Sequence, residues 1–290
     1  MSSEINEKQK KIQQYKNNIK VACVNFMPEL ENKEANLQKI DDYISKLSID
    51  KVNLIVFPEM ALTGYEVEAQ SLAEPIPGPS TDRIEKAAKE NKVYIVAGMP
   101  ERDKTNPDTI YNTAVIFGPK GMLGAYRKMH PFGTELEWAK PGEDLPIWET
   151  EFGPIGIAIC FDHYVFPEAP RVYAVKGCRL LINPSAAGHF EGITGVPEAV
   201  MNQLKARVIE NMVFMASANT VGVQNPTDFF GQSVILGPKP ASVAYQVYAG
   251  PANDKKEEVI TAELDLSLAN QFGYMDQRHA SCYSILAATN

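Results

Sequence analysis

Three side chains with complementary chemistry each follow an apolar run that predicts a β-strand. Glu59 follows NLIVFP, Lys128 lies at the end of a hairpin in GAYRKMHPF, and Cys160 follows IGIAI. A thiol can act as a nucleophile, a carboxylate can accept its proton, and an ammonium can stabilise developing negative charge. A single charge at a strand end is usually a solvated loop residue, but ligands bind at the strand ends of open α/β sheets. We therefore interpret these three residues as candidates for a catalytic site.

The surroundings of Cys160 favour a reactive role. The run from Gly153 to Cys160 contains β-branched and small residues and no charge, which predicts a buried strand. A helical pattern opens at Pro167 and continues to about Lys176. A thiol between a strand and a helix lies near free amide N–H groups and the positive helix end, which favour the thiolate. The alternative is a small buried hydrophobe, as most cysteines after apolar runs are.

The composition argues against several classes of protein. The chain has 290 residues and a net charge of −8 with scattered Lys and Arg, which disfavours nucleic acid or an anionic membrane surface as a partner. No apolar run reaches the ~20 residues that span a bilayer, and the N-terminus lacks the apolar core of a signal peptide. We therefore expect a cytoplasmic protein with free thiols. The histidines show no metal-ligand spacing and no dinucleotide-binding glycine loop occurs, so we expect no metal and no cofactor.

The periodicity of apolar residues predicts strands and helices in alternation, with hairpins between them. Strands are expected at 19–26, 53–57, 93–98, 113–117, 122–128, 153–160, 179–183, 213–218, 232–236, 243–247 and 259–264. Helices are expected at 33–47, 82–91, 167–176 and 197–211. This pattern predicts an α/β fold with mixed sheets.

The chain contains no linker that would divide it. We expect one domain at residues 19–265, a polar lead at residues 1–18, and a tail at residues 266–290 that lies over a neighbouring segment or at a subunit interface. The connection at residues 129–150 is long, and long ordered loops inside compact domains are usually functional.

Three segments resemble the signature segments of the nitrilase superfamily of carbon–nitrogen hydrolases. They are LIVFPEMALTGY, AYRKMHPF and GIAICFDHYVFPE, in the family's order, and RVIENMVFMASANTVG resembles a further family segment. The similarity extends roughly from Ile19 to Leu264. The resemblance implies a four-layer αββα sandwich with mixed sheets, which pairs into homodimers or higher homo-oligomers.

The resemblance also implies roles for individual residues. Glu59 would be the general base, Cys160 the nucleophile, and Lys128 a donor to the oxyanion together with the backbone N–H of Phe161. A second glutamate on the loop after the lysine would orient that lysine. Glu135 matches it best, and Glu137 is the competing candidate because loop lengths vary.

The residues after the nucleophile bear on the substrate. Nitrilases that act on nitriles typically follow the cysteine with Trp-Glu, whereas this chain continues with Phe161 and Asp162. We therefore expect a small-molecule amide first, then a nitrile or an N-carbamoyl amine, on the same three residues. Phe161, Asn183 and Trp138 are the candidates for substrate binding. A non-catalytic thiol-sensing protein on the same fold is the alternative from another class.

Overall fold

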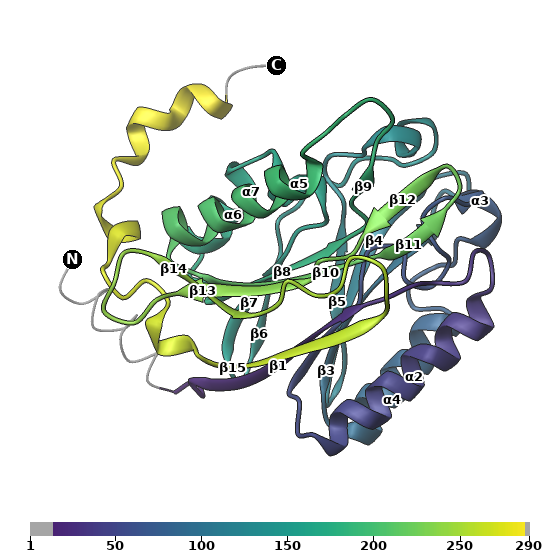
Figure 1. Cartoon of the computed structure of the whole chain (residues 1–290), viewed down its shortest axis with the longest axis horizontal. Coiled ribbons are helices and arrows are strands. Elements are labelled where there is room, and N and C mark those ends of the chain that lie inside the picture. Colours follow the sequence, from purple (N-terminus) through teal and green to yellow (C-terminus); the bar gives the residue numbers. More distant parts are fainter. Residues whose placement is uncertain (1–13, 288–290) are drawn as a thin grey trace.

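Two six-stranded sheets packed face to face form the centre of the computed structural model, which describes residues 14–287 (Figure 1). The first sheet consists, in spatial order, of β15 (Glu258–Asp265), β1 (Asn18–Asn25), β2 (Leu54–Val56), β3 (Tyr94–Arg102), β4 (Ile110–Gly118) and β5 (Gly121–Arg127). The second consists of β14 (Tyr245–Ala249), β13 (Val234–Pro238), β10 (Phe214–Asn219), β8 (Leu180–Ser185), β7 (Gly153–Ile157) and β6 (Ile147–Thr150). Both sheets are mixed, because a parallel centre is flanked by antiparallel strands.

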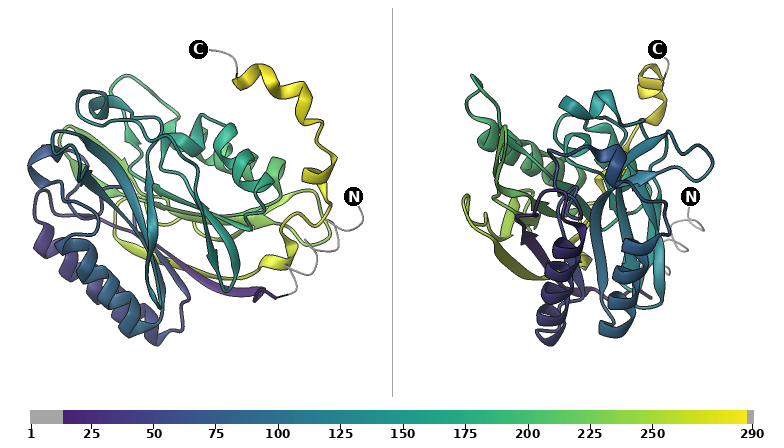
Figure 2. Two further views of the ribbon diagram at one scale, coloured as in Figure 1. Left: turned by 180° about the vertical axis from the view of Figure 1, so that it is seen from behind. Right: turned by 90° about the vertical axis from the view of Figure 1, so that its right-hand side faces the viewer.

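Helices cover the outer face of each sheet, which gives four layers (Figure 2). Helices α2 (Lys33–Ile49) and α4 (Pro79–Asn91) lie on the first sheet, and α6 (Glu168–Val175) and α7 (Val196–Asn211) lie on the second. The expected αββα sandwich with mixed sheets is therefore confirmed. Two short helices, α3 (Ala69–Leu72) and α5 (Phe161–Tyr164), lie in the loops at the strand ends.

The apolar periodicity of α2 shows why these helices form where they do. Its buried side chains include Leu37, Ile40 and Ile44, which recur at helical spacing and pack on the first sheet. Helix α4 begins at Pro79, earlier than the expected start at residue 82, because Pro suits a first helical turn and the Thr81 hydroxyl accepts the N–H of Gly78.

A third, small sheet was not expected from the sequence. It contains β11 (Val221–Gln224), β12 (Thr227–Phe230) and β9 (Gly188–His189), each of which has four residues or fewer. Such short strands carry too little periodicity to be recognised. The sheet stands at the end of the sandwich where the parallel strands terminate (Figure 1).

The C-terminal segment that follows β15 first packs on the body of the molecule and then leaves it. It contains the 3₁₀ turns η2 (Leu266–Leu268), η3 (Tyr274–Gln277) and η4 (Ala280–Ala287), and Figure 1 shows its last part standing clear of the sandwich. Most of the expected polar lead lies outside the described residues. Every helix among residues 14–287 is too short or too polar to traverse a lipid bilayer.

Candidate active site

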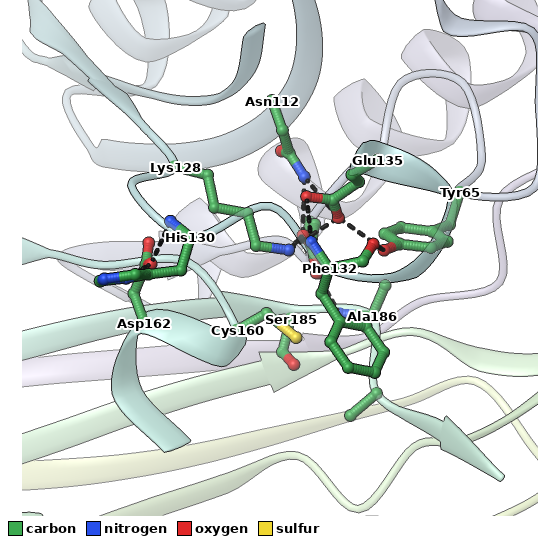
Figure 3. Close-up of polar contacts among 12 residues, drawn as sticks. Tyr65, Asn112, Lys128, His130, Phe132, Glu135, Cys160, Asp162, Ser185 and Ala186 are labelled. Atoms are coloured by element: carbon green, nitrogen blue, oxygen red, sulfur yellow. Dashed lines mark hydrogen bonds and ion pairs between the residues drawn. The ribbon is translucent and has the colours of Figure 1, made fainter. Parts of the chain in front are cut away.

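A buried lysine between two carboxylates is the centre of the site. Lys128 Nζ lies 2.8 Å from Glu59 Oε1 and 2.7 Å from Glu135 Oε1. The Asn112 side-chain amide donates to the same two carboxylates, at 2.7 and 3.2 Å. The Tyr65 hydroxyl donates to Glu135 at 2.5 Å (Figure 3). Lys128, Glu59 and Glu135 are at most 1% exposed, so the charges compensate one another in a dry environment.

Glu59 reaches this cluster from the turn after β2. The turn needs a positive φ at Met60, 53°, and it packs directly on Gly98 of β3. A Cβ at Gly98 would lie 2.5 Å from the Met60 nitrogen and 2.7 Å from the Glu59 Cα, so only glycine lets the turn sit this close. The other Glu59 oxygen, Oε2, accepts the backbone N–H of Ala186 at 2.8 Å. Glu59 thereby connects the ends of both large sheets.

Asp162 ties the lysine segment to the cysteine segment. It lies two residues after Cys160, is fully buried, and accepts the Tyr126 hydroxyl at 2.7 Å. Its carboxylate also accepts the backbone N–H groups of Met129 and His130, at 3.3 and 2.9 Å. The segment immediately after Lys128 is therefore held against the turn that carries Cys160.

The backbone of Cys160 adopts an unusual conformation. Its φ is 48° and its ψ is −107°, a sparsely populated region for a residue with a Cβ. Its N–H donates to the Asn183 side-chain oxygen at 2.9 Å and to the Pro184 carbonyl at 3.0 Å. Asn183 is in turn held by a 2.9 Å hydrogen bond to Ser217. Strained backbone that is fixed by its surroundings is common at functional sites.

The thiol of Cys160 belongs to the same electrostatic cluster. Figure 3 shows its side chain beside those of Lys128 and Ser185. Burial and the nearby Glu59 carboxylate raise the pKa of the Cys160 thiol well above its usual value, more than the Lys128 ammonium lowers it. The surroundings of Cys160 therefore favour the thiol over the thiolate, opposite to the direction expected from the sequence.

The pKa values of Lys128 and Glu135 describe how charge is distributed in the site. Burial lowers the pKa of Lys128, but the Glu59 and Glu135 carboxylates raise it by more, so it stands well above its usual value and the ammonium stays charged. Burial raises the pKa of Glu135 to about 7, against the opposing effect of Lys128. A thiol, a proton acceptor and a fixed cation together can support attack on a carbonyl carbon.

A cavity of about 240 Å³ opens beside Cys160. Three phenylalanine rings line this cavity: Phe132, Phe161 and Phe190. The ring centroid of Phe132 lies 4.8 Å from that of Phe161 and 5.5 Å from that of Phe190. Phe161 itself lines the cavity, and no acceptor for its backbone N–H is found among the described residues. The cavity therefore gives a small molecule access to Cys160.

The predicted site residues do not all reach this cavity. Glu59, Lys128, Cys160 and Glu135 come together, and Phe161 lines the cavity. Of the two loop glutamates, Glu135 contacts Lys128, whereas the side chain of Glu137 is exposed.

The two other residues expected to bind substrate lie elsewhere. Asn183 is fully buried and holds the Cys160 backbone instead of lining the cavity. Trp138 lines a separate hollow with Glu66 and Glu137.

Asn112, Asp162 and Tyr65 are polar members of the site that sequence reasoning did not single out. Asn112 lies in the strand YNTAVIF, where a buried amide among apolar neighbours is the available signal. Asp162 carried a signal as the first charge after the Cys160 strand. Among the described residues, no group of three His, Cys, Asp or Glu side chains is arranged to hold a metal ion.

Comparison with known proteins relates this geometry to a family. The family model for carbon–nitrogen hydrolases matches residues 20–274. A probable nitrilase of Schizosaccharomyces pombe is 34% identical, over 92% of this chain and 97% of its own length. A nitrilase of Pyrococcus abyssi is 33% identical, over 86% and 91%. Omega-amidase NIT2 of Xenopus tropicalis is 30% identical, over 87% and 92%.

Solved structures share the fold. Nit3 of Saccharomyces cerevisiae, a member of branch 10 of the nitrilase superfamily, superposes with a TM-score of 0.80 at 28% identity, over 92% of this chain and 97% of that one. An amidase from a Nesterenkonia species superposes with a TM-score of 0.76 at 23% identity, over 92% and 96%. The expected fold therefore has direct structural counterparts.

Proposed function

Because this chain belongs to the carbon–nitrogen hydrolase family, we propose that it hydrolyses the C–N bond of a small amide through a thioester on Cys160. The products are a carboxylate and ammonia or an amine. The observation that carries this proposal is the buried Glu59–Lys128–Glu135 cluster, of which Glu59 raises and Lys128 lowers the pKa of the Cys160 thiol.

The first half of the reaction forms the acyl-enzyme. Glu59 accepts the thiol proton as Cys160 Sγ bonds to the amide carbon, so the thiolate need not exist beforehand. The carbonyl oxygen becomes negative, and the Lys128 ammonium with the Phe161 N–H stabilises it. The C–N bond then breaks, and the leaving nitrogen takes the proton held by Glu59.

The second half returns the enzyme to its starting state. Water gives a proton to Glu59 and attacks the thioester carbon, again with the oxyanion facing Lys128. The C–S bond breaks, the thiolate recovers a proton from Glu59, and the carboxylic acid leaves. Glu135 and Asn112 keep Lys128 in place throughout, since both contact the lysine or its carboxylate partner.

Ammonia release over a panel of amides, nitriles and N-carbamoyl amines tests the proposal. The wild-type protein should release ammonia from an amide, and Cys160→Ala should release none while unfolding at the same temperature. Cys178→Ala is the matched control, because Cys178 is buried outside this cluster and should leave turnover intact. Full activity of Cys160→Ala would refute the proposal.

Nitrile hydrolysis is the second candidate, because two relatives at 33–34% identity are named as nitrilases. The thiol would add to the nitrile carbon, and water would convert the resulting thioimidate into the thioester with loss of ammonia. The panel separates the candidates by kcat/KM, and an N-carbamoyl substrate would also release carbon dioxide. A thiol sensor is disfavoured, since sensor cysteines have low pKa values and burial raises that of Cys160.

We also propose that the chain forms a homodimer through its C-terminal tail. Phe272, Tyr274 and Tyr283 are 38–50% exposed on this segment, and its last part stands clear of the body (Figure 1). Aromatic side chains presented in this way are typical of surfaces that bind a partner.

A further inference from the structure

The cavity beside Cys160 has no charged wall. Its lining, all within the described part of the chain, contains no Asp, Glu, Lys or Arg side chain. Helix α5 contributes Phe161 and Tyr164, Val165 follows it, and helix α7 contributes Val196 and Val200. With the three phenylalanines already described, these residues make the walls predominantly apolar, and Gln203 and Thr194 are the only amide and aliphatic hydroxyl side chains in this lining.

Two basic side chains close to the cavity, Lys128 and Arg207, are already engaged. Lys128 is 1% exposed and bridges its two glutamates. Arg207 lies under α5, where its guanidinium donates to the carbonyls of His163 and Tyr164 at 3.0 and 2.9 Å. Arg207 is therefore not available to pair with an anionic group on the acyl chain, and in the proposed reaction Lys128 serves the carbonyl oxygen at Cys160 and does not line the cavity.

The N-terminus of α7 does not supply an anion site in their place. Gly195 and Val196 line the cavity, but Pro197 has no N–H, and the N–H of Ala199 already donates to the Gly195 carbonyl at 2.9 Å. Glu198 adds an exposed carboxylate in the same turn, so an incoming anion would meet a like charge.

We propose that the acyl half of the substrate is uncharged and apolar, as in an amide of a branched aliphatic or phenyl-substituted monocarboxylic acid. An amide that carries a second carboxylate is rejected, because that group would lose its water without gaining a cation or enough N–H donors. This inference rests on the proposed function for the chemistry, and on the cavity for the specificity.

Two amides of nearly the same shape test the inference. Isocaproamide ends in an isopropyl group where succinamate ends in a carboxylate, so the pair differs mainly in charge. For the wild-type protein, kcat/KM should be at least about 100-fold higher for isocaproamide. Equal values, or faster turnover of succinamate, would overturn the inference.

A substitution in the cavity wall provides a second test. Val200→Lys places an ammonium where the wall is now apolar, so it should raise kcat/KM for succinamate relative to isocaproamide by about tenfold or more. Val200→Met is the matched control, because it has a similar length without charge and should keep the wild-type preference. A ratio that Val200→Lys leaves at the wild-type value would contradict the inference.

Binding separates this inference from the proposed function. If the folded wild-type protein released ammonia from no amide of the panel, the proposed function would be in error, and calorimetric titration of Cys160→Ala would still report on the cavity. Binding of isocaproamide without binding of succinamate would then support the inference. Binding of neither, or of succinamate at least as tightly, would refute it.

Discussion

The positive charge of Lys128 is compensated by the groups that surround it. Two carboxylates and an amide surround it, and the three charged groups are buried together. Such a cluster is stable only when all its members are present, because a buried charge without a partner has lost its hydration and gained no compensating ion pair. The same arrangement keeps the ammonium fixed where an oxyanion would develop.

Replacing Lys128 should therefore damage both activity and stability. Lys128→Met should lower kcat by about 100- to 1,000-fold and the free energy of unfolding by about 3–5 kcal/mol, since it leaves two carboxylates facing each other. Steady-state kinetics and urea unfolding measure the two effects. Lys120→Met, at an exposed hairpin position, is the control. A Lys128→Met protein with near wild-type kcat would contradict the oxyanion role.

Glu135 predicts a pH dependence of stability. Its pKa rises from 4.5 to about 7 on folding because of burial, so the folded protein holds this proton more tightly than the unfolded chain does. The contribution is fully present below pH 4.5 and is lost as pH rises through about 7. Glu135→Gln should therefore gain stability relative to wild type between pH 5 and pH 8 in urea unfolding. If the free energies of unfolding of wild type and Glu135→Gln changed with pH in parallel, Glu135 would not titrate in this window.

For individual residues, the sequence predicted which residue types form the site better than it predicted which position of the loop reaches Lys128. Glu59, Lys128 and Cys160 stand at strand ends, where a charge or thiol is conspicuous against apolar runs. Glu135 and Glu137 are two residues apart on a loop without periodicity, so the sequence could not decide which one meets Lys128. The structure brings Glu135 to it through a 3₁₀ turn, η1 (Gly133–Glu137).

At the scale of elements, the site depends on the junction between β5 and α5. Asp162 on α5 accepts backbone N–H groups from the two residues that follow Lys128. It also accepts from Tyr126, near the end of β5. The lysine and the nucleophile come from different sheets, so this junction fixes the distance between them.

Removing the Asp162 carboxylate should loosen that junction. Asp162→Ala leaves the donors of Met129, His130 and Tyr126 without an acceptor, and should cost about 1–3 kcal/mol for each donor left buried. Since Asp162 positions Lys128 and does not touch substrate, kcat should fall more than KM rises, and Asp162→Asn should restore part of the loss. Kinetics and thermal unfolding of both variants test this. Unchanged kcat in a folded Asp162→Ala protein would refute the positioning role.

The elements themselves were largely predictable where periodicity was strong. Most strands and the helices α2, α6 and α7 occur within about two residues of their expected limits, whereas β3 and β4 extend beyond the expected limits and β7 ends before Cys160. The small sheet, β6, α3 and α5 were missed because two to four residues form no pattern. The chain between β7 and Cys160 continues beside β8, where the N–H of Ala158 donates to Ile182 and that of Cys160 to Pro184.

At the scale of the whole molecule, the four layers could not be predicted from periodicity alone. Strand order places β15 beside β1, and neither local propensity nor spacing encodes such long-range pairing. The sandwich was expected because motifs in the right order resembled a family. Those motifs lie at the strand ends, where the chemistry requires specific residues, whereas the core accepts many apolar combinations.

The tail gives a prediction at this scale. Residues 266–273 dock on the body, as the bond from Asn270 N–H to the Met212 carbonyl at 2.7 Å illustrates, whereas most of residues 274–284 are exposed. Deleting residues 274–290 should convert a dimer into a monomer without lowering the unfolding temperature by more than a few degrees. Light scattering after size exclusion measures the mass. A wild-type monomer, or a truncated protein of unchanged oligomeric mass, would refute the tail interface.

The most direct test of the central claim is the mass of the protein during turnover. Wild-type protein is mixed with the amide that releases ammonia fastest, and the reaction is quenched in acid. The protein is then digested, and the masses of its peptides are measured by mass spectrometry. The account predicts one acyl group on the peptide that contains Cys160, removable by hydroxylamine as a thioester would be. Sustained ammonia release with the Cys160 peptide unmodified, and equal release by Cys160→Ala, would contradict it.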